Sequence, residues 1–116
     1  MNTKMTLHEQ QSAFARDVSY LIQYIIADPK YSVTLGESWR SKEQAQLYAK
    51  QGKGIVNSLH CERLAIDLNL FREGVYLTDT KDYEWIGMWW EKLDKQNRWG
   101  GRFKRADGNH FERTKI

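Results

Sequence analysis

The middle of the chain reads Ser58-Leu-His-Cys-Glu-Arg-Leu-Ala-Ile-Asp-Leu-Asn-Leu-Phe71. From Leu64 onward the residues alternate or run apolar, which predicts a β-strand, but the run contains Asp67. An ionised carboxylate in apolar surroundings costs free energy unless a cation or several hydrogen-bond donors meet it. His60 stands upstream at the edge of a glycine-containing loop, so a turn can bring its imidazole beside this carboxylate. The segment therefore predicts two metal ligands on adjacent elements.

A third ligand has to come from elsewhere, and His110 is the best candidate because it follows the tight turn Asp107-Gly-Asn and leads into another predicted strand. His8 is a weaker candidate, since nothing around it in its predicted helix would fix the ring. Two histidines and one aspartate leave a fourth position for water, which is the arrangement of catalytic zinc. Asp107 could then act as general base. Spacing alone leaves the alternative equally open, in which both histidines and Asp67 have purely structural partners.

Helices and short strands are predicted on both sides of this segment. A capping box at Thr6 starts a first helix, which should end at Asp28-Pro29, and a second capping box at Ser41 starts a helix that Gly52 ends. The other predicted elements are a strand over 31–35, a hairpin turn over 72–75, a third helix between Asp82 and Lys95, and short strands that contain Phe103 and Phe111. This pattern predicts an α+β fold, a small antiparallel sheet flanked by helices, in a single domain over residues 1–116.

Composition limits the classes of function. The net charge of +3 and a pI near 9.0 favour polyanionic partners, but the basic residues are scattered except near the C-terminus, which favours a solvated surface over a nucleic-acid patch. Cys61 is the only cysteine, so no internal disulfide can form, as is typical of proteins folded in a reducing cytoplasm. Neither a signal peptide nor a membrane span is recognisable.

Four segments resemble the M15 peptidases. The spacing from Ser58 through His60 to Asp67 matches their Ser-x-His-x6-Asp motif, and Asp107-Gly-Asn-His-Phe-Glu112 resembles their second motif. The segments 37–44 and 99–103 also match, so the resemblance runs from about Val33 to the C-terminus, and it is closest to phage endolysins of the family. One departure is Arg63, where many members have glycine.

The resemblance implies a zinc-binding fold shared with Hedgehog and D-Ala-D-Ala peptidases. It assigns Zn²⁺ to His60, Asp67 and His110, the general base to Asp107, and the contact with a substrate carbonyl or developing oxyanion to Arg40. Two further residues are predicted at the substrate: Ser58, whose hydroxyl could equally stabilise a turn, and Trp99, which the neighbouring glycines would leave at the cleft.

The function expected from these features is cleavage of the L-Ala-D-Glu bond of peptidoglycan stem peptides by a phage endolysin. The expected partner is peptidoglycan, with no nucleic acid and no membrane insertion, and the protein is expected to be a monomer. It would be made in the host cytoplasm and reach the cell wall after the membrane is permeabilised. The alternatives are a D,D-peptidase or D-Ala-D-Ala dipeptidase, an inactive relative, and a non-catalytic basic module that binds cell wall or nucleic acid.

Overall fold

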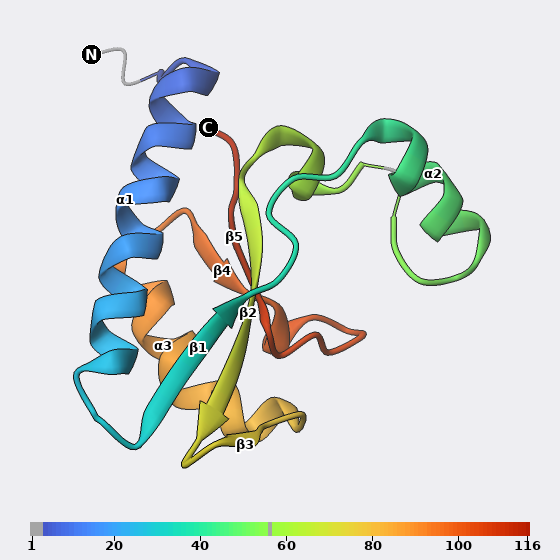
Figure 1. Ribbon diagram of the computed structural model, residues 1–116. Helices are drawn as coiled ribbons and strands as arrows, with labels where there is room; N and C mark the ends of the chain where they lie inside the picture. Colours follow the sequence, from blue (N-terminus) through green and yellow to red (C-terminus); the bar gives the residue numbers. More distant parts are fainter. Residues whose placement is uncertain (1–3, 56) are drawn as a thin grey trace.

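The computed structural model describes residues 4–55 and 57–116, which form a five-stranded sheet and three α-helices; the first and third helices lie beside the sheet and the second lies apart from it (Figure 1). The helices are α1 (Leu7–Ile26), α2 (Lys42–Lys50) and α3 (Glu84–Leu93), and short 3₁₀-helices cover Leu59–Glu62, Thr80–Tyr83 and Gly100–Arg102. The strands are β1 (Tyr31–Leu35), β2 (Ala65–Arg72), β3 (Val75–Tyr76), β4 (Asn97–Trp99) and β5 (His110–Arg113). They pair antiparallel in the order β1-β2-β5-β4, with β3 also paired to β2, so the predicted α+β class is confirmed.

Both predicted capping residues are in place. The Thr6 hydroxyl accepts a hydrogen bond from the Glu9 amide and the Glu9 carboxylate accepts one from the Thr6 amide, which closes the capping box of α1. At α2 the Ser41 hydroxyl accepts from the Gln44 amide. The chain turns after α2 at Gly52, whose φ of 70° lies in the region that favours glycine. Within the described residues, no helix is long and apolar enough to cross a membrane.

β2 is the central strand, and its two faces have different tasks. Ile66, Leu68 and Leu70 are buried in the core that α1 and α3 cover from one side of the sheet (Figure 1). Because side chains alternate along a strand, Asp67 points to the opposite face. The apolar run had indicated that the carboxylate lies among apolar side chains, but it lies on the other face of its strand. One strand therefore supplies both the core and the site.

The remaining connections differ in part from the prediction. The hairpin between β2 and β3 is confirmed, and its turn residues Glu73 and Gly74 both have positive φ. The strand predicted at Phe103 is wrong: this residue follows the last 3₁₀-helix in a bend, and its ring lies 5.6 Å from the ring of His110. The strand that pairs with β5 is instead β4, which ends at Trp99.

Candidate metal centre and active site

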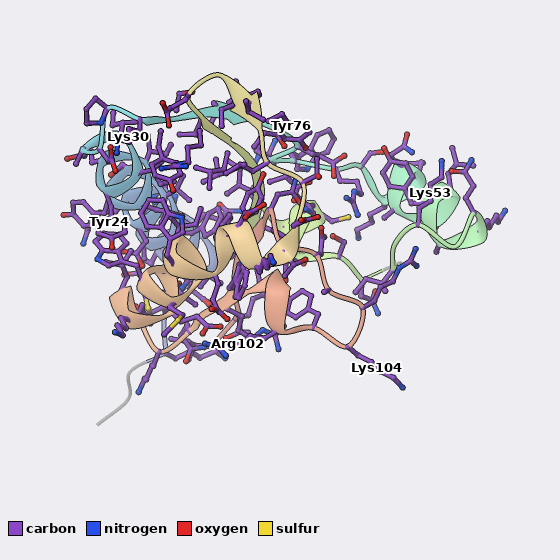
Figure 2. All side chains as sticks on the ribbon, turned by 90° about the horizontal axis from the view of Figure 1, so that it is seen from below. Tyr24, Lys30, Lys53, Tyr76, Arg102 and Lys104 are labelled. Atoms are coloured by element: carbon purple, nitrogen blue, oxygen red, sulfur yellow. The ribbon has the colours of Figure 1, made fainter. Side chains whose placement is uncertain are left out.

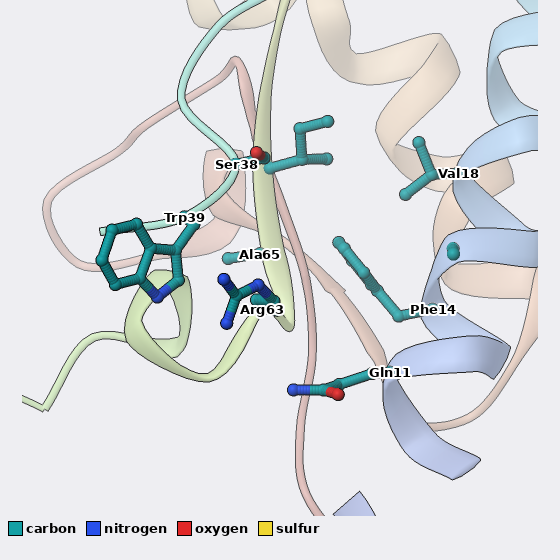
Figure 3. A pocket seen from close by; sticks show the side chains of 9 residues that line it. Gln11, Phe14, Val18, Ser38, Trp39, Arg63 and Ala65 are labelled. Atoms are coloured by element: carbon teal, nitrogen blue, oxygen red, sulfur yellow. The ribbon is translucent and has the colours of Figure 1, made fainter. Parts of the chain in front are cut away.

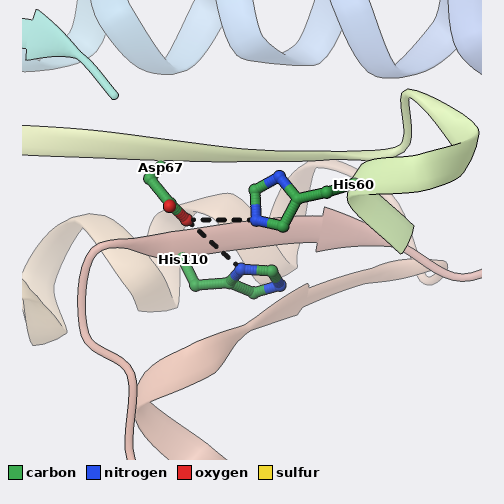
Figure 4. Close-up of side chains that lie close together, drawn as sticks. All are labelled: His60, Asp67 and His110. Carbon is green, nitrogen blue, oxygen red and sulfur yellow. Dashed lines mark ion pairs between the residues drawn. The ribbon is translucent and has the colours of Figure 1, made fainter. Parts of the chain in front are cut away.

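Three elements bring the predicted ligands together. Asp67 and His110 are directly opposite each other in the register of β2 and β5, and His60 lies in the 3₁₀-helix that precedes β2 (Figure 4). The Ser58 hydroxyl caps this 3₁₀-helix by accepting a hydrogen bond from the His60 amide at 3.1 Å. The cross-strand pair and the capped turn thus fix all three side chains on the face of the sheet away from the core.

The geometry of the cluster fits a metal ion. Asp67 Oδ1 lies 3.3 Å from His60 Nε2 and 3.4 Å from His110 Nδ1, and one ligand atom from each residue lies within 4.8 Å of the others. Oδ1 is buried and makes no hydrogen bond, which is costly for a carboxylate oxygen unless a cation binds it. Two imidazole nitrogens and one carboxylate oxygen are the donor types that zinc prefers, with a position left over for water. The residues present therefore fit a catalytic zinc ion.

The outer nitrogen of each imidazole is held by a backbone or carboxylate oxygen. His110 Nε2 donates to Glu112 at 2.7 Å, and His60 Nδ1 lies 3.4 Å from the Ser38 carbonyl oxygen. These contacts leave His60 Nε2 and His110 Nδ1 facing Asp67, as ligands require. Glu112 is itself buried and accepts from Arg98 at 2.9 Å. Glu112 lies within the sequence motif, but no role was predicted for it. The feature that could have indicated one is its spacing of two residues from His110, which places both side chains on the same face of β5.

Charge is strongly redistributed in the cluster. Burial raises the pKa of Asp67, but the neighbouring imidazoles of His110 and His60 outweigh it and lower this pKa to about 2. Burial lowers the pKa of His110, yet the carboxylates of Asp67 and Glu112 outweigh it and raise it to about 9. Without a metal, His110 is therefore an imidazolium between two carboxylates at neutral pH. A metal that binds Nδ1 replaces that proton.

Asp107 lies beside the cluster without belonging to it. Its Oδ2 is 3.9 Å from His110 Nδ1, and 57% of its side chain is exposed. Partial withdrawal from water raises its pKa, the His110 charge opposes this, and the Asp67 carboxylate raises it further. Its amide donates to the Gly100 carbonyl at 2.9 Å, which ties the loop before β5 to the end of β4. Asp107 is thus held at the edge of the cluster and lines the same cleft.

Arg40 lines the same cleft. Its guanidinium donates to the Glu37 carboxylate and, at 3.3 Å, to the Ser58 hydroxyl, and it lies 4.9 Å from the ring of Tyr48. The Ser58 hydroxyl therefore links Arg40 to the turn that carries His60. The cleft has a volume of about 500 Å³ and is lined by His60, Asp67, His110, Asp107, Arg40 and Ser58 among others.

Trp99 does not line this cleft, so that prediction is wrong. Its side chain is only 3% exposed, and its indole nitrogen donates to the Gly108 carbonyl at 2.7 Å. A Cβ on Gly87 or on Gly101 would lie 2.1 Å from the indole, so the two glycines make room for the ring inside the protein. Trp99 therefore holds the loop that carries Asp107 from the buried side, through its hydrogen bond to Gly108.

Arg63 borders a second hollow, between α1 and the start of β2 (Figure 3). The hollow has a volume of about 340 Å³, its walls are mainly apolar, and none of the three clustered residues lines it. Arg63 caps the 3₁₀-helix with a φ of 57°, and its guanidinium lies 5.2 Å from the Trp39 ring. A left-handed backbone strains glycine less than any residue with a side chain, which accounts for the glycine that resembling sequences have here.

Comparisons with known proteins agree with this geometry. The profile of a peptidase M15 family, described as D-alanyl-D-alanine carboxypeptidase, matches residues 51–113, more than half of the chain and all of it that carries the cluster and Asp107. A search of curated proteins gives no match.

Two solved structures share the fold. The L-Ala D-Glu endopeptidase ChiX of Serratia marcescens has a TM-score of 0.73 and 21% identity, over 89% of this chain and 79% of ChiX. A mutant of the vancomycin resistance D,D-pentapeptidase VanY with bound Zn(II) has a TM-score of 0.60 and 15% identity, over 90% of this chain and 72% of VanY.

Proposed function

Because this chain belongs to the M15 peptidases and is therefore a zinc metallopeptidase, we propose that it cleaves the L-Ala-D-Glu bond in the stem peptides of peptidoglycan. The observation that carries the proposal is the convergence of His60, Asp67 and His110 in one cleft with Asp107 beside them. The motif resemblance to endolysins supports this bond, as does the shared fold with ChiX, which is itself named an L-Ala D-Glu endopeptidase.

In the proposed reaction, His60, Asp67 and His110 would hold the zinc ion. When bound, zinc supplies Lewis-acid chemistry that lowers the pKa of a water and polarises a carbonyl. Asp107 takes a proton from the attacking water and passes it to the nitrogen of the breaking C–N bond. A carboxyl whose pKa is raised, as that of Asp107 is, gives up such a proton less readily to solvent and holds it for the leaving amine.

In this scheme Arg40, which lines the cleft, stabilises the carbonyl oxygen as it gains negative charge. Its side chain is fixed by Glu37 and Ser58, so little reorganisation is needed when the charge develops. Arg40 lies outside the region that the family profile matches, and its assignment rests on this geometry and on the motif. Ser58 acts in this scheme by holding Arg40 and the His60 turn.

The cleaved bond can be identified by digesting purified peptidoglycan and labelling the new amino termini. We expect D-Glu at the new termini. Asp107→Ala should lower kcat/KM by about 10²- to 10⁴-fold while zinc stays bound, because Asp107 is not a ligand. Asp79→Ala, which removes an exposed aspartate elsewhere, is the matched control and should be silent. Full activity of Asp107→Ala would exclude the mechanism.

A D,D-peptidase is the second candidate, favoured by the family's description and by the fold shared with VanY. It predicts alanine instead of glutamate at the new amino termini, so the same digest decides between the two bonds.

The proposal includes a role in bacteriolysis by a phage, with the enzyme made inside the host and released to the wall when the membrane is permeabilised. Cells that produce the protein should remain intact until a pore-forming agent is added and should then lose turbidity. Cells that produce Asp107→Ala should not. Lysis without permeabilisation, or none after it, would contradict this role.

A further inference from the structure

Four basic side chains line the metal cleft, and they fall into two classes. Arg40 is paired with Glu37, and Arg98 with Glu112. Lys53 and Arg105 also line the cleft, and both are exposed. Over residues 4–55 and 57–116 neither of them forms an ion pair, and the only side-chain hydrogen bond is from Arg105 to a backbone carbonyl. The cleft therefore has two cations whose charge the protein itself leaves unmatched.

The loop after α2 places these two cations near each other. Arg105 Nη1 donates to the carbonyl of Gly52 at 2.6 Å, and Lys53 is the next residue. One residue further, a Cβ on Gly54 would lie 3.5 Å from Arg40 Nη1. Lys53 thus lies between Gly52, which Arg105 contacts, and Gly54, whose backbone lies close to Arg40, in the loop after α2 where Figure 2 labels it. The two cations belong to one rim of the cleft.

The position of Asp107 shows which part of a substrate this rim would meet. Arg105 precedes Asp107 by only two residues, in the loop that is tied to Gly100. In the proposed reaction Asp107 protonates the leaving nitrogen, whereas Arg40 contacts the carbonyl oxygen. In that reaction the residue that carries the leaving nitrogen would therefore lie along the loop of Arg105, and Lys53 would reach it through the contact between Arg105 and Gly52.

We propose that Lys53 and Arg105 together bind a free carboxylate on the carbon next to the scissile nitrogen. In a stem peptide D-Glu continues the chain through its γ-carboxyl, so its α-carboxylate is free at this position. Charge-assisted hydrogen bonds from an ammonium and a guanidinium suit such a group, and Arg105 keeps donors that Gly52 does not use. The inference rests on the proposed function and names the substrate feature that the cleft selects.

The test compares two synthetic peptides, one with L-Ala-γ-D-Glu and one in which the same α-carboxylate is a carboxamide, as in D-isoglutamine. The wild-type zinc enzyme should cleave the carboxylate peptide with a kcat/KM about 10- to 100-fold higher, mainly through KM. Lys53→Gln and Arg105→Gln should each lower kcat/KM for the carboxylate peptide alone, so that the ratio falls towards one. Arg105→Lys and Lys53→Arg should restore part of the ratio.

Lys104→Gln is the matched control, because Lys104 carries the same type of charge in the same loop but does not line the cleft (Figure 2). It should leave the ratio unchanged. Equal cleavage of both peptides by the wild type would overturn the inference while leaving the proposed function intact, as would variants that slow both peptides equally, since that is the result of a purely structural loop contact. Cleavage of neither peptide at the L-Ala-D-Glu bond would overturn the proposed function and this inference with it.

Discussion

At the scale of single residues, Glu112 determines which ring nitrogen of His110 faces the metal site. Its carboxylate accepts from Nε2 and leaves Nδ1 for the cluster. Glu112→Gln keeps the shape of the side chain but removes the charge that makes the imidazole a stronger ligand, so zinc affinity should fall by about 10- to 100-fold. Competition with a chromophoric chelator measures this. Glu62→Gln, at a partly exposed glutamate paired with Lys115, should leave zinc affinity unchanged, and an equal loss in both variants would contradict the assignment.

Arg63 makes a separate prediction about stability. Arg63→Gly and Arg63→Ala both remove the contact with Trp39, but only alanine keeps a Cβ at a φ of 57°. The glycine variant should therefore have the larger free energy of unfolding, by about 1 kcal/mol. At most other positions the alanine variant would be the more stable of the two. Denaturant unfolding of the metal-free variants tests this. An alanine variant more stable than the glycine variant would show that the turn relaxes.

At the scale of elements, the loop before β5 depends on Gly100. An added Cβ there would lie 2.3 Å from the Asp107 carbonyl oxygen and 2.8 Å from His110 Cβ. Gly100→Ala must push the loop away from β4, and a displacement of about 1 Å at a catalytic group can cost about 10²-fold in rate. We expect weaker zinc binding and a similar loss of kcat/KM, measured by chelator competition and peptide cleavage. Lys104→Ala in the same loop should change neither.

The elements were predictable from sequence to the extent that local chemistry fixes them. The cap residues Thr6 and Ser41 marked the starts of α1 and α2, because capping is a contact between near neighbours in the chain. β4 was missed because three residues are too few to show a period. Trp99 was misplaced because its burial depends on space left by Gly87 in α3, which no local pattern reveals.

The site was predictable in its ligands but not in its supports. The apolar run around Asp67 and the two histidines beside turns made His60, Asp67 and His110 candidates, and the motif resemblance singled them out. The structure brings the three together, although the Asp67 carboxylate faces away from the apolar side of its strand. Glu112 escaped notice because its role is a contact across the cleft face of β5, which depends on how the strand is oriented. The roles of Asp107, Arg40 and Ser58 remain predictions that the activity measurements test.

At the scale of the whole molecule, the charged cluster makes the stability of the metal-free protein depend on pH. The pKa of Asp67 falls from 3.8 to about 2, so its contribution is present above pH 3.8 and is lost as pH falls towards 2. The pKa of His110 rises from 6.5 to about 9, so its contribution is present below pH 6.5 and is lost as pH rises through 9. Chelator-treated protein should therefore become less stable on both sides of this interval.

Zinc should remove the alkaline part of this loss, because His110 gives up its proton on binding. The difference in Tm between zinc-loaded and chelator-treated protein should grow from pH 6 to pH 9, as scanning calorimetry can measure. His8→Gln should leave the difference unchanged and His110→Gln should abolish it. A difference that shrinks as pH rises would contradict protonation of His110 in the metal-free protein.

Core and site side chains alternate along β2, so the protein can be catalytically active only if β2 is paired in the correct register. A slip by one residue would turn Asp67 into the core and Leu68 into the cleft, so a misregistered molecule would lose its zinc and its packing together. Leu68→Ala, which should cost about 2 to 5 kcal/mol, should lower the yield of active enzyme but leave the turnover of each zinc-loaded molecule unchanged. Activity normalised to bound zinc would show this, and the zinc content of a preparation would then count its correctly folded molecules.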